Sequence, residues 1–543
     1  MINKNKINTK FIFFTGGVVS SVGKGVTAAA MGRLLKERGF NITAQKLDPY
    51  INVDPGTMSP YQHGEVFVLD DGAETDLDLG HYERFIDIRL NKTCNVTSGQ
   101  VYAEVISNER FGNYLGGTIQ VIPHITDEIK KRIMLVAAAK ESDFVLVEVG
   151  GTVGDIESLP FLESLRQLRS ELGRDNTFFI HLTWLPHIKA TNEIKTKPTQ
   201  HSVRELRSIG ITPNMIVARA DYAIDTTIIE KISKFCDVEP QAVIPMQTID
   251  FFYEVPLLLE KAKVGQYILN HFKIKAKKKP DWTNWNKIVE NYKKPRFEIR
   301  IAIVGKYVEL HDAYISVKEA ITHATINNHA VAQIEWIHSV EIENGKKLEI
   351  LKNCDAIIVP GGFGSRGVEG KILTAKYARE NKVPFFGLCL GMQLMVVEYA
   401  RNFYQDENAN STEFNPDTTL PIIDIMPDQK NLTKKGGTMR LGLYPCKLIA
   451  GTTAANVYKK KIIHERHRHR YEINNTYRKD LEKAGLIFSG QSPDGKLAEI
   501  AELQDHPFML GTQFHPEFLS RPNKPHPLFN AFIRAIIKIK YQE

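Results

Sequence analysis

The chain has 543 residues, of which 43% are hydrophobic and 24% charged, with a formal net charge of +7. Such a composition is typical of a globular chain with several domains, and the modest charge favours small anionic ligands over nucleic acid. No apolar run approaches the roughly 18 residues of a membrane span, and the first one, 11–14, is too short for a signal peptide. Five widely spaced cysteines without a C-x-x-C pair predict a reducing cytoplasmic setting, not disulfides or zinc.

A glycine-rich turn near the start predicts a phosphate site. It spans residues 15–25, after a strand-like run at 11–14 and before an alanine-rich helical stretch at 26–38. In this arrangement backbone N–H groups and the helix dipole face an anion, and Lys24 adds charge. The turn departs from G-x-x-x-x-G-K-[ST] because Gly25 stands where a Mg²⁺-binding hydroxyl is usual. A plain tight turn is the alternative.

Strand-like and helix-like segments alternate from residue 11 to about 269, which predicts a parallel sheet flanked by helices. Ligands of such sheets collect at the carboxyl ends of the strands. The second strand, 42–47, brings Lys46 and Asp48 to that edge. The polar stretch 52–64 is too long for a simple connection, so we expect a functional loop or a flexible surface excursion.

Two acidic residues predict a metal site. Asp78 ends an acidic cluster at 70–78, and Glu148 ends a buried-strand run at 144–148. Mg²⁺ prefers one or two carboxylates together with the phosphates of a substrate. We therefore predict that Asp78 and Glu148 hold Mg²⁺ in place of the missing hydroxyl. Alone, the acidic cluster is typical of a solvated turn.

Two further strings, 154–158 and 195–200, favour a second anionic ligand. Lys-x-Lys-Pro with flanking hydroxyls can hold a triphosphate, and Asp155 and Glu157 can accept hydrogen bonds from a base or sugar. Surface loops, or charge pairing between the two strings, are the competing interpretations.

Together these motifs resemble the CTP synthase family. The resemblance rests on residues 16–21, 46–58, 70–85, 150–160 and 195–202, in order, and covers nearly all of the first 270 residues. It implies a P-loop-type parallel-sheet amidoligase domain, in which ATP phosphorylates the 4-oxygen of UTP so that ammonia can displace it. The family's own phosphate loop has glycine after the lysine.

The resemblance also implies the binding residues. It assigns ATP to Ser21, Val22, Gly23, Lys24, Gly25 and Val26, with Asp78 at the metal and Ile249 bordering the adenine. It assigns UTP, or the inhibitory product CTP, to Ser20, Asp155, Ile156, Glu157, Lys195, Thr196, Lys197, Pro198, Thr199, Gln200 and Lys231. By its residues alone, the stretch around Lys231 is helical and favours a solvated lysine.

Residues 273–296 are predicted to connect two domains, 1–272 and 297–543. They are lysine-rich, have proline near both ends and contain one short helix with Trp282 and Trp285. A nucleic-acid-binding tether is the alternative.

The second half begins a new α/β pattern, with a strand at 299–304, a helix at 313–325 and a strand at 356–359. Its chemical centre is Cys389, at a predicted strand-to-helix turn between Gly387 and Gly391. The N-terminus of the following helix can stabilise a thiolate there. A buried, inert cysteine is the alternative.

A base and its orienting acid are predicted at His515 and Glu517. If the segment is extended, residues i and i+2 share a face, so both can point toward Cys389. A His-Pro-Glu string alone is typical of a turn. With the cysteine, it resembles the class I glutamine amidotransferases, and the second half resembles the α/β glutaminase domain of the same CTP synthase family.

In that family Cys389 would attack the amide of L-glutamine, the Gly362 and Leu390 N–H groups would hold the oxyanion, and His515 would protonate the departing ammonia. The glutamine-binding set implied by the resemblance is Gly362, Leu390, Gly391, Met392, Gln393, Glu413 and Arg470. Arg470 lies in the stretch 465–472, which alone is typical of a solvated basic surface.

The resemblance implies further regulation and assembly. GTP would activate glutamine hydrolysis near the flexible stretch 361–367, a candidate lid that contains Arg366. Ammonia would pass near His63 and Val66. Residues 424–436 look shorter than in most family members and are interpreted as a surface loop. Homotetramers, and also filaments, would form, with no nucleic-acid or membrane partner.

The predicted function is therefore glutamine-dependent formation of CTP from UTP and ATP. Two alternatives stay open: another P-loop amidoligase such as the cobyrinic-acid amidases, and a non-enzymatic partition-type ATPase or filament protein with an inert second domain.

Overall fold

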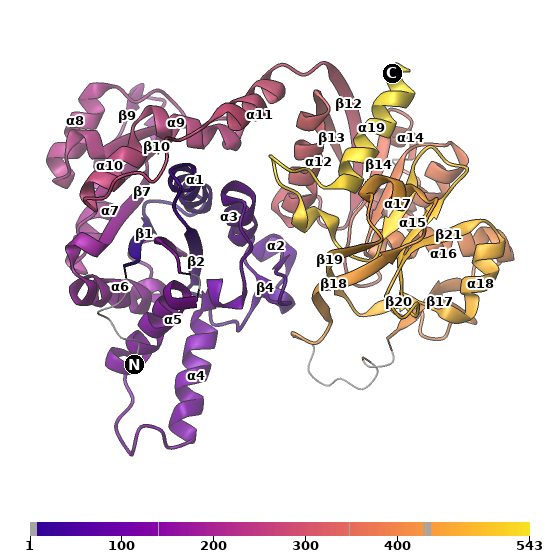
Figure 1. Ribbon diagram of the computed structural model, residues 1–543, viewed down its shortest axis with the longest axis horizontal. Coiled ribbons are helices and arrows are strands. Elements are labelled where there is room, and N and C mark those ends of the chain that lie inside the picture. The colour runs from indigo at the N-terminus through magenta and orange to yellow at the C-terminus, as the bar shows by residue number, and fades with distance from the viewer. Residues whose placement is uncertain (1–7, 140, 347, 427–428, 430–435, 543) are drawn as a thin grey trace. The chain divides into compact units, whose positions relative to one another are not determined.

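The computed structural model describes residues 8–139, 141–346, 348–426, 429 and 436–542 (Figure 1). The chain forms two compact units, Met1–Asp54 with Asp78–Val289, and Pro55–Leu77 with Glu290–Glu543. Residues 1–272 are predicted from the sequence to form one domain. The structure differs at residues 55–77, which pack with the second unit.

The first unit is built on a seven-stranded sheet in the order β11-β10-β7-β1-β6-β2-β5. All of its strand pairs are parallel, as the alternation of segments predicted. The strands are β1 (Lys10–Gly16), β2 (Ile42–Asp48), β5 (Asn95–Thr97), β6 (Phe144–Val149), β7 (Thr177–Trp184), β10 (Met215–Ala220) and β11 (Val243–Gln247).

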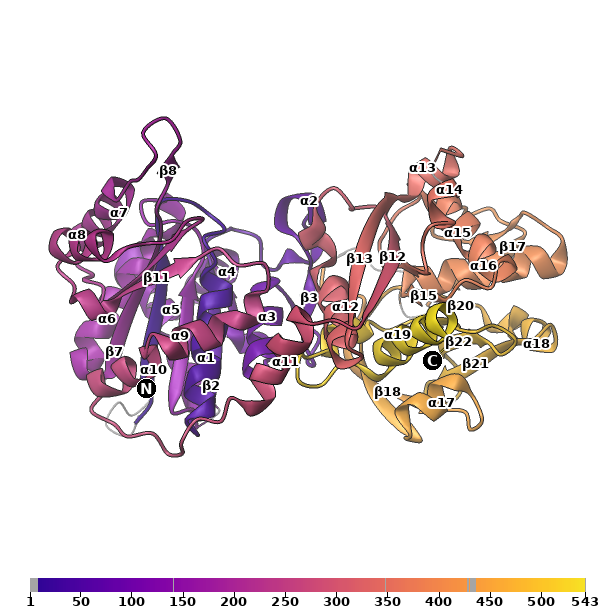
Figure 2. The same ribbon diagram turned by 90° about the horizontal axis from the view of Figure 1, so that it is seen from above.

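Helices cover both faces of this sheet (Figure 2). Along β1, Phe11 and Phe13 face one layer, formed by α4 (Ser98–Arg110), α5 (Thr126–Ala139), α6 (Leu159–Leu172) and α7 (Lys197–Ser208). The other layer holds α1 (Lys24–Glu37), α3 (Asp78–Ile86), α9 (Val255–Lys261) and α10 (Val264–His271), and α8 (Thr226–Cys236) packs beside α7 and β11. The alternation of side chains along a strand explains why both faces are apolar.

The second unit has a nine-stranded sheet in the order β13-β12-β14-β15-β23-β22-β21-β18-β19. Its first five strands are parallel and the rest antiparallel. The strands are β12 (Phe297–Gly305), β13 (Ala330–His338), β14 (Ala356–Val359), β15 (Phe385–Leu388), β18 (Arg440–Leu448), β19 (Ile462–His469), β21 (Leu486–Gln491), β22 (Ala498–Leu503) and β23 (Met509–Thr512).

Two apolar cores flank this sheet. Ala302 and Val304 of β12 pack with α15 (Val368–Glu380) and α16 (Leu390–Tyr404), whereas Ile301 and Ile303 face α12 (Ile315–Asn327) and α19 (Pro527–Tyr541). Smaller elements are α13 (Ser339–Glu343), α14 (Leu348–Leu351), α17 (Thr453–Tyr458), α18 (Asn475–Lys483) and the sheet of β16 (Ala409–Ser411), β17 (Leu420–Ile425) and β20 (Tyr471–Ile473). The second unit is thus a three-layer α/β fold, as predicted.

Residues 55–77 form α2 (Pro60–His63) and a two-stranded hairpin, β3 (Phe67–Val68) with β4 (Glu74–Thr75). They are held in the second unit through polar contacts, of which the one between Ser316 and Glu65 is buried. Ser316 donates its N–H (3.2 Å) and its hydroxyl to the Glu65 carboxylate, and the Tyr61 hydroxyl donates to the Lys306 carbonyl at 2.6 Å. Residues 55–64 of the long polar stretch predicted at 52–64 are therefore part of the second unit, whereas residues 52–54 belong to the first.

The predicted short helix of the connection is α11 (Thr283–Lys293). It is not solvated on all sides, because Trp285 is only 2% exposed and donates its indole N–H to the Tyr253 carbonyl at 2.6 Å. Arg33 lies over the same ring at 4.8 Å from its centroid. Trp285 thereby anchors α11 to the first unit.

Replacing this anchor is expected to destabilise the first unit. Trp285→Ala should lower its free energy of unfolding by about 3–5 kcal/mol, because it leaves a cavity and an unpaired carbonyl. Urea unfolding followed by circular dichroism measures this. Asn284→Ala on the exposed side of α11 is the control, and equal stability of the two variants would contradict the anchoring role.

Candidate functional site

Cys389 lies at the turn between β15 and α16, as predicted. Its backbone has φ 51° and ψ −102°, a conformation that non-glycine residues seldom adopt. Its N–H donates to the Thr512 carbonyl at 2.7 Å. A side chain at Gly391 would overlap the Val359 carbonyl, so glycine is required for the helix to start this close to β14. The turn presents the Cys389 sulfur at the N-terminus of α16.

His515 and Glu517 lie beside this sulfur. The His515 Nδ1 and the Glu517 Oε1 are 2.7 Å apart, and both side chains are buried. The predicted extended segment is wrong: residues 516–519 form a 3₁₀ turn, η11 (Pro516–Leu519), and the turn brings the imidazole and carboxylate together. Within the described residues, the His515 Nε2 has no hydrogen-bond partner apart from the cysteine.

The surroundings of His515 favour its protonated form. Burial alone lowers its pKa, but the neighbouring Glu517 and Cys389 outweigh burial and raise the pKa to about 10. At neutral pH the His515 imidazole is therefore in its protonated, positively charged form. It lies between the Glu517 carboxylate and the Cys389 sulfur. This is the arrangement of a cysteine nucleophile with its general acid and base.

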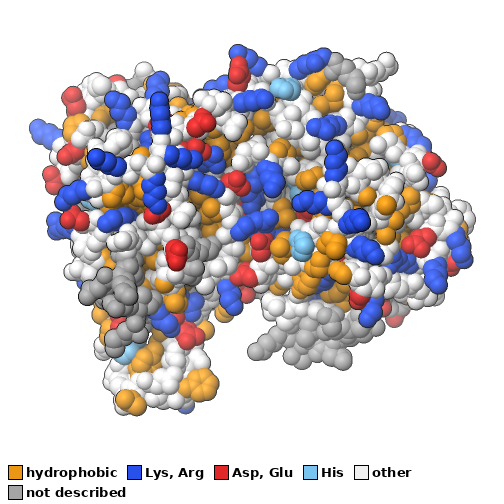
Figure 3. Space-filling view, in the orientation of Figure 1, with side chains coloured by type: hydrophobic (Ala, Val, Ile, Leu, Met, Phe, Trp, Pro, Cys, Tyr) orange, Lys and Arg blue, Asp and Glu red, His pale blue; other side chains and the backbone are white. Residues whose placement is uncertain are grey.

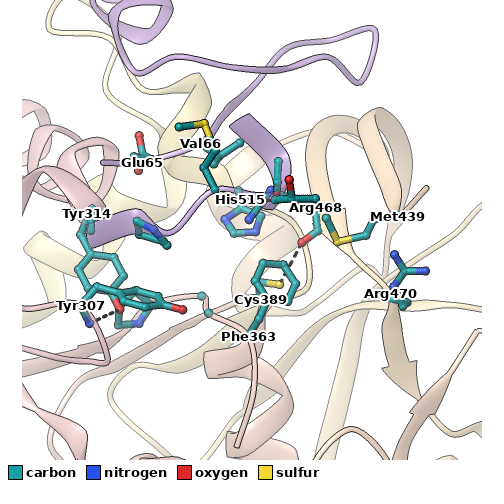
Figure 4. Close-up of a pocket in the computed structure, with 18 of the residues that line it drawn as sticks. Glu65, Val66, Tyr307, Tyr314, Phe363, Cys389, Met439, Arg468, Arg470 and His515 are labelled. Carbon is teal, nitrogen blue, oxygen red and sulfur yellow. Dashed lines mark hydrogen bonds between the residues drawn. The ribbon is translucent and has the colours of Figure 1, made fainter. Parts of the chain in front are cut away.

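The three residues open into a cavity of about 820 Å³ within the second unit (Figure 4). Its lining includes Gly362, Glu413 and Arg470 from the predicted glutamine-binding set, and Val66 from the predicted ammonia passage. His63 is not among the lining residues; its Nε2 lies 3.4 Å from Asp76.

Four other members of that set do not line the cavity. Leu390, Gly391, Met392 and Gln393 form the buried first turn of α16. The Gln393 side-chain amide donates to the Tyr471 carbonyl at 2.9 Å and to Gln513 at 3.2 Å. Through these hydrogen bonds Gln393 stabilises the structure behind the cavity wall.

Gln513 belongs to the site but is not among the residues predicted from the sequence. Its side-chain amide lies 3.7 Å from the Cys389 sulfur and is positioned to donate to it. The sequence did offer an indication, because Gln513 stands two residues before His515. Only the pairing of strands β15 and β23 shows that Gln513 contacts Cys389.

The basic stretch around Arg470 is not a solvated surface. In β19, Arg466 and His467 are fully buried. The Arg466 Nε contacts Asp70 at 2.7 Å, and the Arg468 Nε contacts Glu74 at 2.8 Å. Part of the acidic cluster at 70–78 therefore pairs with the arginines of β19.

The predicted phosphate loop lies between β1 and α1. Val18, Ser21 and Gly23 all have positive φ, which turns successive N–H groups toward a concave surface. The Lys24 Nζ donates to the Gly151 carbonyl at 2.5 Å, and burial lowers the pKa of Lys24. The loop has the geometry of an anion site at a helix N-terminus.

The structure gives a steric reason for Gly25. A Cβ at this position would overlap the Asp78 carboxylate. Asp78 thus occupies the space that the side chain of an ordinary P-loop serine or threonine would fill.

Asp78 and Glu148 share one cation, Lys46. The Lys46 Nζ contacts the Asp78 carboxylate and lies 3.1 Å from Glu148. Burial and the Asp78 charge raise the pKa of Glu148 to about 7; burial also opposes the charge on Asp78, but Lys46 brings its pKa down to about 2. Lys46 is a second residue for which the sequence predicts a position, at the end of β2, but no role.

Two carboxylates within reach of one ammonium fit a divalent cation. Among the described residues no cluster of three or more His, Cys, Asp or Glu could hold a metal ion. Mg²⁺ prefers one or two carboxylates together with phosphates and water, and Asp78 and Glu148 offer two carboxylates beside the phosphate loop.

Four of the residues predicted to bind UTP lie in the loops that follow β1 and β6. Ser20, Asp155, Ile156 and Glu157 are exposed. The Val153 N–H donates to the Gly16 carbonyl at 2.8 Å, so the loop that carries them touches the phosphate loop. The Asp155 carboxylate accepts from the Thr152 N–H at 2.7 Å.

The second predicted triphosphate string is partly helical, because α7 begins at Lys197. Lys195 pairs with Glu193 on the strand β9 (Glu193–Ile194), and Lys231 on α8 is close enough to lower the pKa of the same glutamate. Thr196 and Thr199 are buried, Pro198 and Gln200 half-buried, and Lys197 exposed. Ile249 follows the edge strand β11 and is half-buried.

Residues 427–428 and 430–435 of the predicted short loop lie outside the described residues. On the face drawn in Figure 3, basic side chains are mixed with acidic and neutral ones. No helix in the described part of the chain has both the length and the apolar character needed to cross a membrane.

A phosphate loop with two acids in one unit, and a Cys-His-Glu site in an α/β fold in the other, define a glutamine-dependent amidoligase. Comparison agrees: the profile described as "CTP synthase N-terminus" matches residues 10–274, and that of class I glutamine amidotransferases matches 309–535. The chain belongs to the CTP synthase family, whose members are glutamine-hydrolysing ligases.

Individual relatives are close. The CTP synthase of Dehalococcoides mccartyi is 60% identical over 98% of this chain and 97% of its own. The CTP synthase of Carboxydothermus hydrogenoformans is 60% identical over 98% of this chain and 99% of its own. A solved glutaminase domain of Trypanosoma brucei CTPS with bound acivicin is 40% identical, covers 44% of this chain and 94% of its own, and has a TM-score of 0.42.

A side chain at Gly25 should disable the phosphate loop. Gly25→Ala is expected to weaken ATP–Mg²⁺ binding, measured by calorimetry, about 100-fold or more, because the new Cβ displaces Asp78. Gly436→Ala is the control, because an added Cβ there would lie 3.5 Å from its nearest neighbour, in ordinary contact. Unchanged ATP binding by Gly25→Ala would refute the steric argument.

Glu517→Gln should lower the pKa of His515 and reduce glutamine hydrolysis about 10²–10⁴-fold. The raised pKa also links to stability: Glu517 stabilises the fold fully below pH about 6.5, and this contribution disappears as pH rises through about 10. Urea unfolding at several pH values tests the sign. The stability gap between wild type and variant should shrink toward pH 10; a gap that widens would contradict it. Asp417→Asn is the exposed control.

Proposed function

We propose that this chain makes CTP from UTP, with ATP as the phosphoryl donor and L-glutamine as the nitrogen source. The observation that carries the proposal is the Cys389–His515–Glu517 site opening into a cavity lined by Glu413 and Arg470. We assign residues 1–272 to amidoligase chemistry, 273–296 to the connection and 297–543 to glutamine hydrolysis, with residues 55–77 serving the second unit.

Glutamine hydrolysis follows from the geometry. The Cys389 sulfur attacks the side-chain amide carbon, and the Gly362 and Leu390 N–H groups hold the oxyanion. His515 gives its proton to the departing ammonia, leaving a thioester on Cys389. The neutral imidazole then takes a proton from water, which releases glutamate. Glu413 and Arg470 suit the charged ends of glutamine, because they offer a carboxylate and a guanidinium on the cavity wall.

The first unit would carry out the ATP-dependent half. Ser21, Val22, Gly23, Gly25 and Val26 present the loop, and Lys24 neutralises phosphate charge. Asp78 and Glu148 would hold Mg²⁺, which supplies charge neutralisation for the transferred phosphoryl group when bound. The γ-phosphoryl group moves to the 4-oxygen of UTP, and ammonia displaces it as phosphate. UTP, ATP, glutamine and water thus yield CTP, ADP, phosphate and glutamate.

The remaining assignments rest on family resemblance and on chemistry. Lys195, Lys197 and Lys231 suit the triphosphate of UTP or of inhibitory CTP. GTP as an activator fits beside residues 361–367, where the cavity is larger than glutamine needs. We also propose a homotetramer able to form filaments, and a cytoplasmic location, because all five cysteines are free and a thiol nucleophile requires a reducing setting.

Two variants separate the halves. Cys389→Ala should abolish glutamine-driven CTP formation, by at least about 10³-fold, and leave ammonia-driven formation within about 3-fold. Lys24→Ala should stop CTP formation from either nitrogen source and spare basal glutamine hydrolysis. CTP absorbance and glutamate release are the measurements.

The two readouts also show how the proposal would fail. Loss of ammonia-driven synthesis in folded Cys389→Ala would contradict the division of labour. A wild-type protein that never aminates UTP, with glutamine or ammonium, would refute the function itself.

A further inference from the structure

A buried lysine lies beside the Cys389 site and is not part of the proposed reaction so far. Lys371, in the first turn of α15, is 0% exposed. Its Nζ donates to the Pro360 carbonyl at 3.0 Å, and no other hydrogen bond of this group is found among the described residues. An ammonium or amine so buried, with one acceptor for its donors, destabilises a fold compared with an apolar side chain.

The bonded carbonyl belongs to the loop after β14, which also carries a proposed oxyanion donor. Pro360 precedes Gly361 and Gly362, and all three line the cavity. A Cβ added at Gly362 would lie 3.7 Å from the Lys306 Cδ, 3.8 Å from the Lys371 Nζ and 3.8 Å from Leu390. Lys371 therefore sits behind the Gly362 peptide, on the side of α16.

The far end of the same loop is held as well. The buried Lys306 donates to the Phe363 carbonyl at 3.0 Å and to the Gly364 carbonyl, and the Gly364 N–H donates to Glu413 at 2.9 Å. Residues 360–364 are thus fixed at both ends, although their glycines would otherwise permit many conformations. The two lysines differ in their acceptors: the carbonyl bound by Lys371 precedes Gly362, whereas those bound by Lys306 follow it.

We propose that Lys371 is a positioning residue for glutamine hydrolysis: by binding the Pro360 carbonyl, it holds the Gly362 N–H where the oxyanion forms. This inference rests on the proposed function. A donor held about 1 Å out of place loses much of its effect on the transition state, while binding of uncharged ground-state glutamine amide changes little.

The test uses the full chain with Lys371→Met, which keeps the length of the side chain and removes the donor. Glutamine hydrolysis should fall about 30–300-fold in kcat with KM within about 3-fold. Inhibition by an aldehyde analogue of glutamine, which forms a tetrahedral adduct on Cys389, should weaken by the same factor. Lys376→Met, exposed on the same helix, is the matched control.

Alkylation of Cys389 by iodoacetamide separates positioning from collapse of the site. Alkylation builds no oxyanion, so its rate should stay within about 3-fold of wild type. A parallel fall in alkylation and hydrolysis, or unchanged hydrolysis, would overturn the inference. If wild type itself fails to hydrolyse glutamine, the proposed function fails instead.

A second variant covers the case in which Lys371→Met does not fold. Lys371→Arg keeps a donor on a long side chain, and it should retain hydrolysis within about 10-fold of wild type. If Lys371→Arg lost as much glutamine hydrolysis as Cys389→Ala while its alkylation stayed normal, this would count against a role through the Pro360 carbonyl.

Discussion

The second unit depends on the backbone of Cys389. A non-glycine residue at φ 51° and ψ −102° costs about 1–3 kcal/mol, so its surroundings must over-determine it. They do so through the bond from its N–H to Thr512, the close contact of Gly391 with Val359 and the fully buried start of α16. The strain has a consequence: the sulfur stands at a helix N-terminus facing His515, where a thiolate can be stabilised.

The main constraint in the first unit is electrostatic and concerns the charges beside the phosphate loop. Asp78, Glu148 and Lys46 are brought together in a largely buried space, where Lys24 is also close enough to lower the pKa of both carboxylates. The two carboxylates suit a divalent cation, whereas the phosphate loop next to them suits an anion. Gly25 joins the two features, because its missing side chain lets the Asp78 carboxylate approach the start of α1.

Residues 55–77 show how far chain order can differ from packing. By sequence they belong between two strands of the first unit, yet Asp70 and Glu74 pair with Arg466 and Arg468 of the second. Val66 lines the same cavity as Cys389. A short excursion of the first half of the sequence thereby forms part of the wall of the second unit's site.

The sequence by itself determined the parallel sheet of the first unit, its phosphate loop, the cysteine turn and the pairing of His515 with Glu517, since these are local patterns of a few residues. Only the tertiary structure decided that Lys46 lies between Asp78 and Glu148, that Gln513 meets Cys389, that Gln393 braces a wall and that Lys371 lies behind Gly362. Each of these depends on strands or helices that are distant in sequence and become neighbours only when their apolar faces are buried.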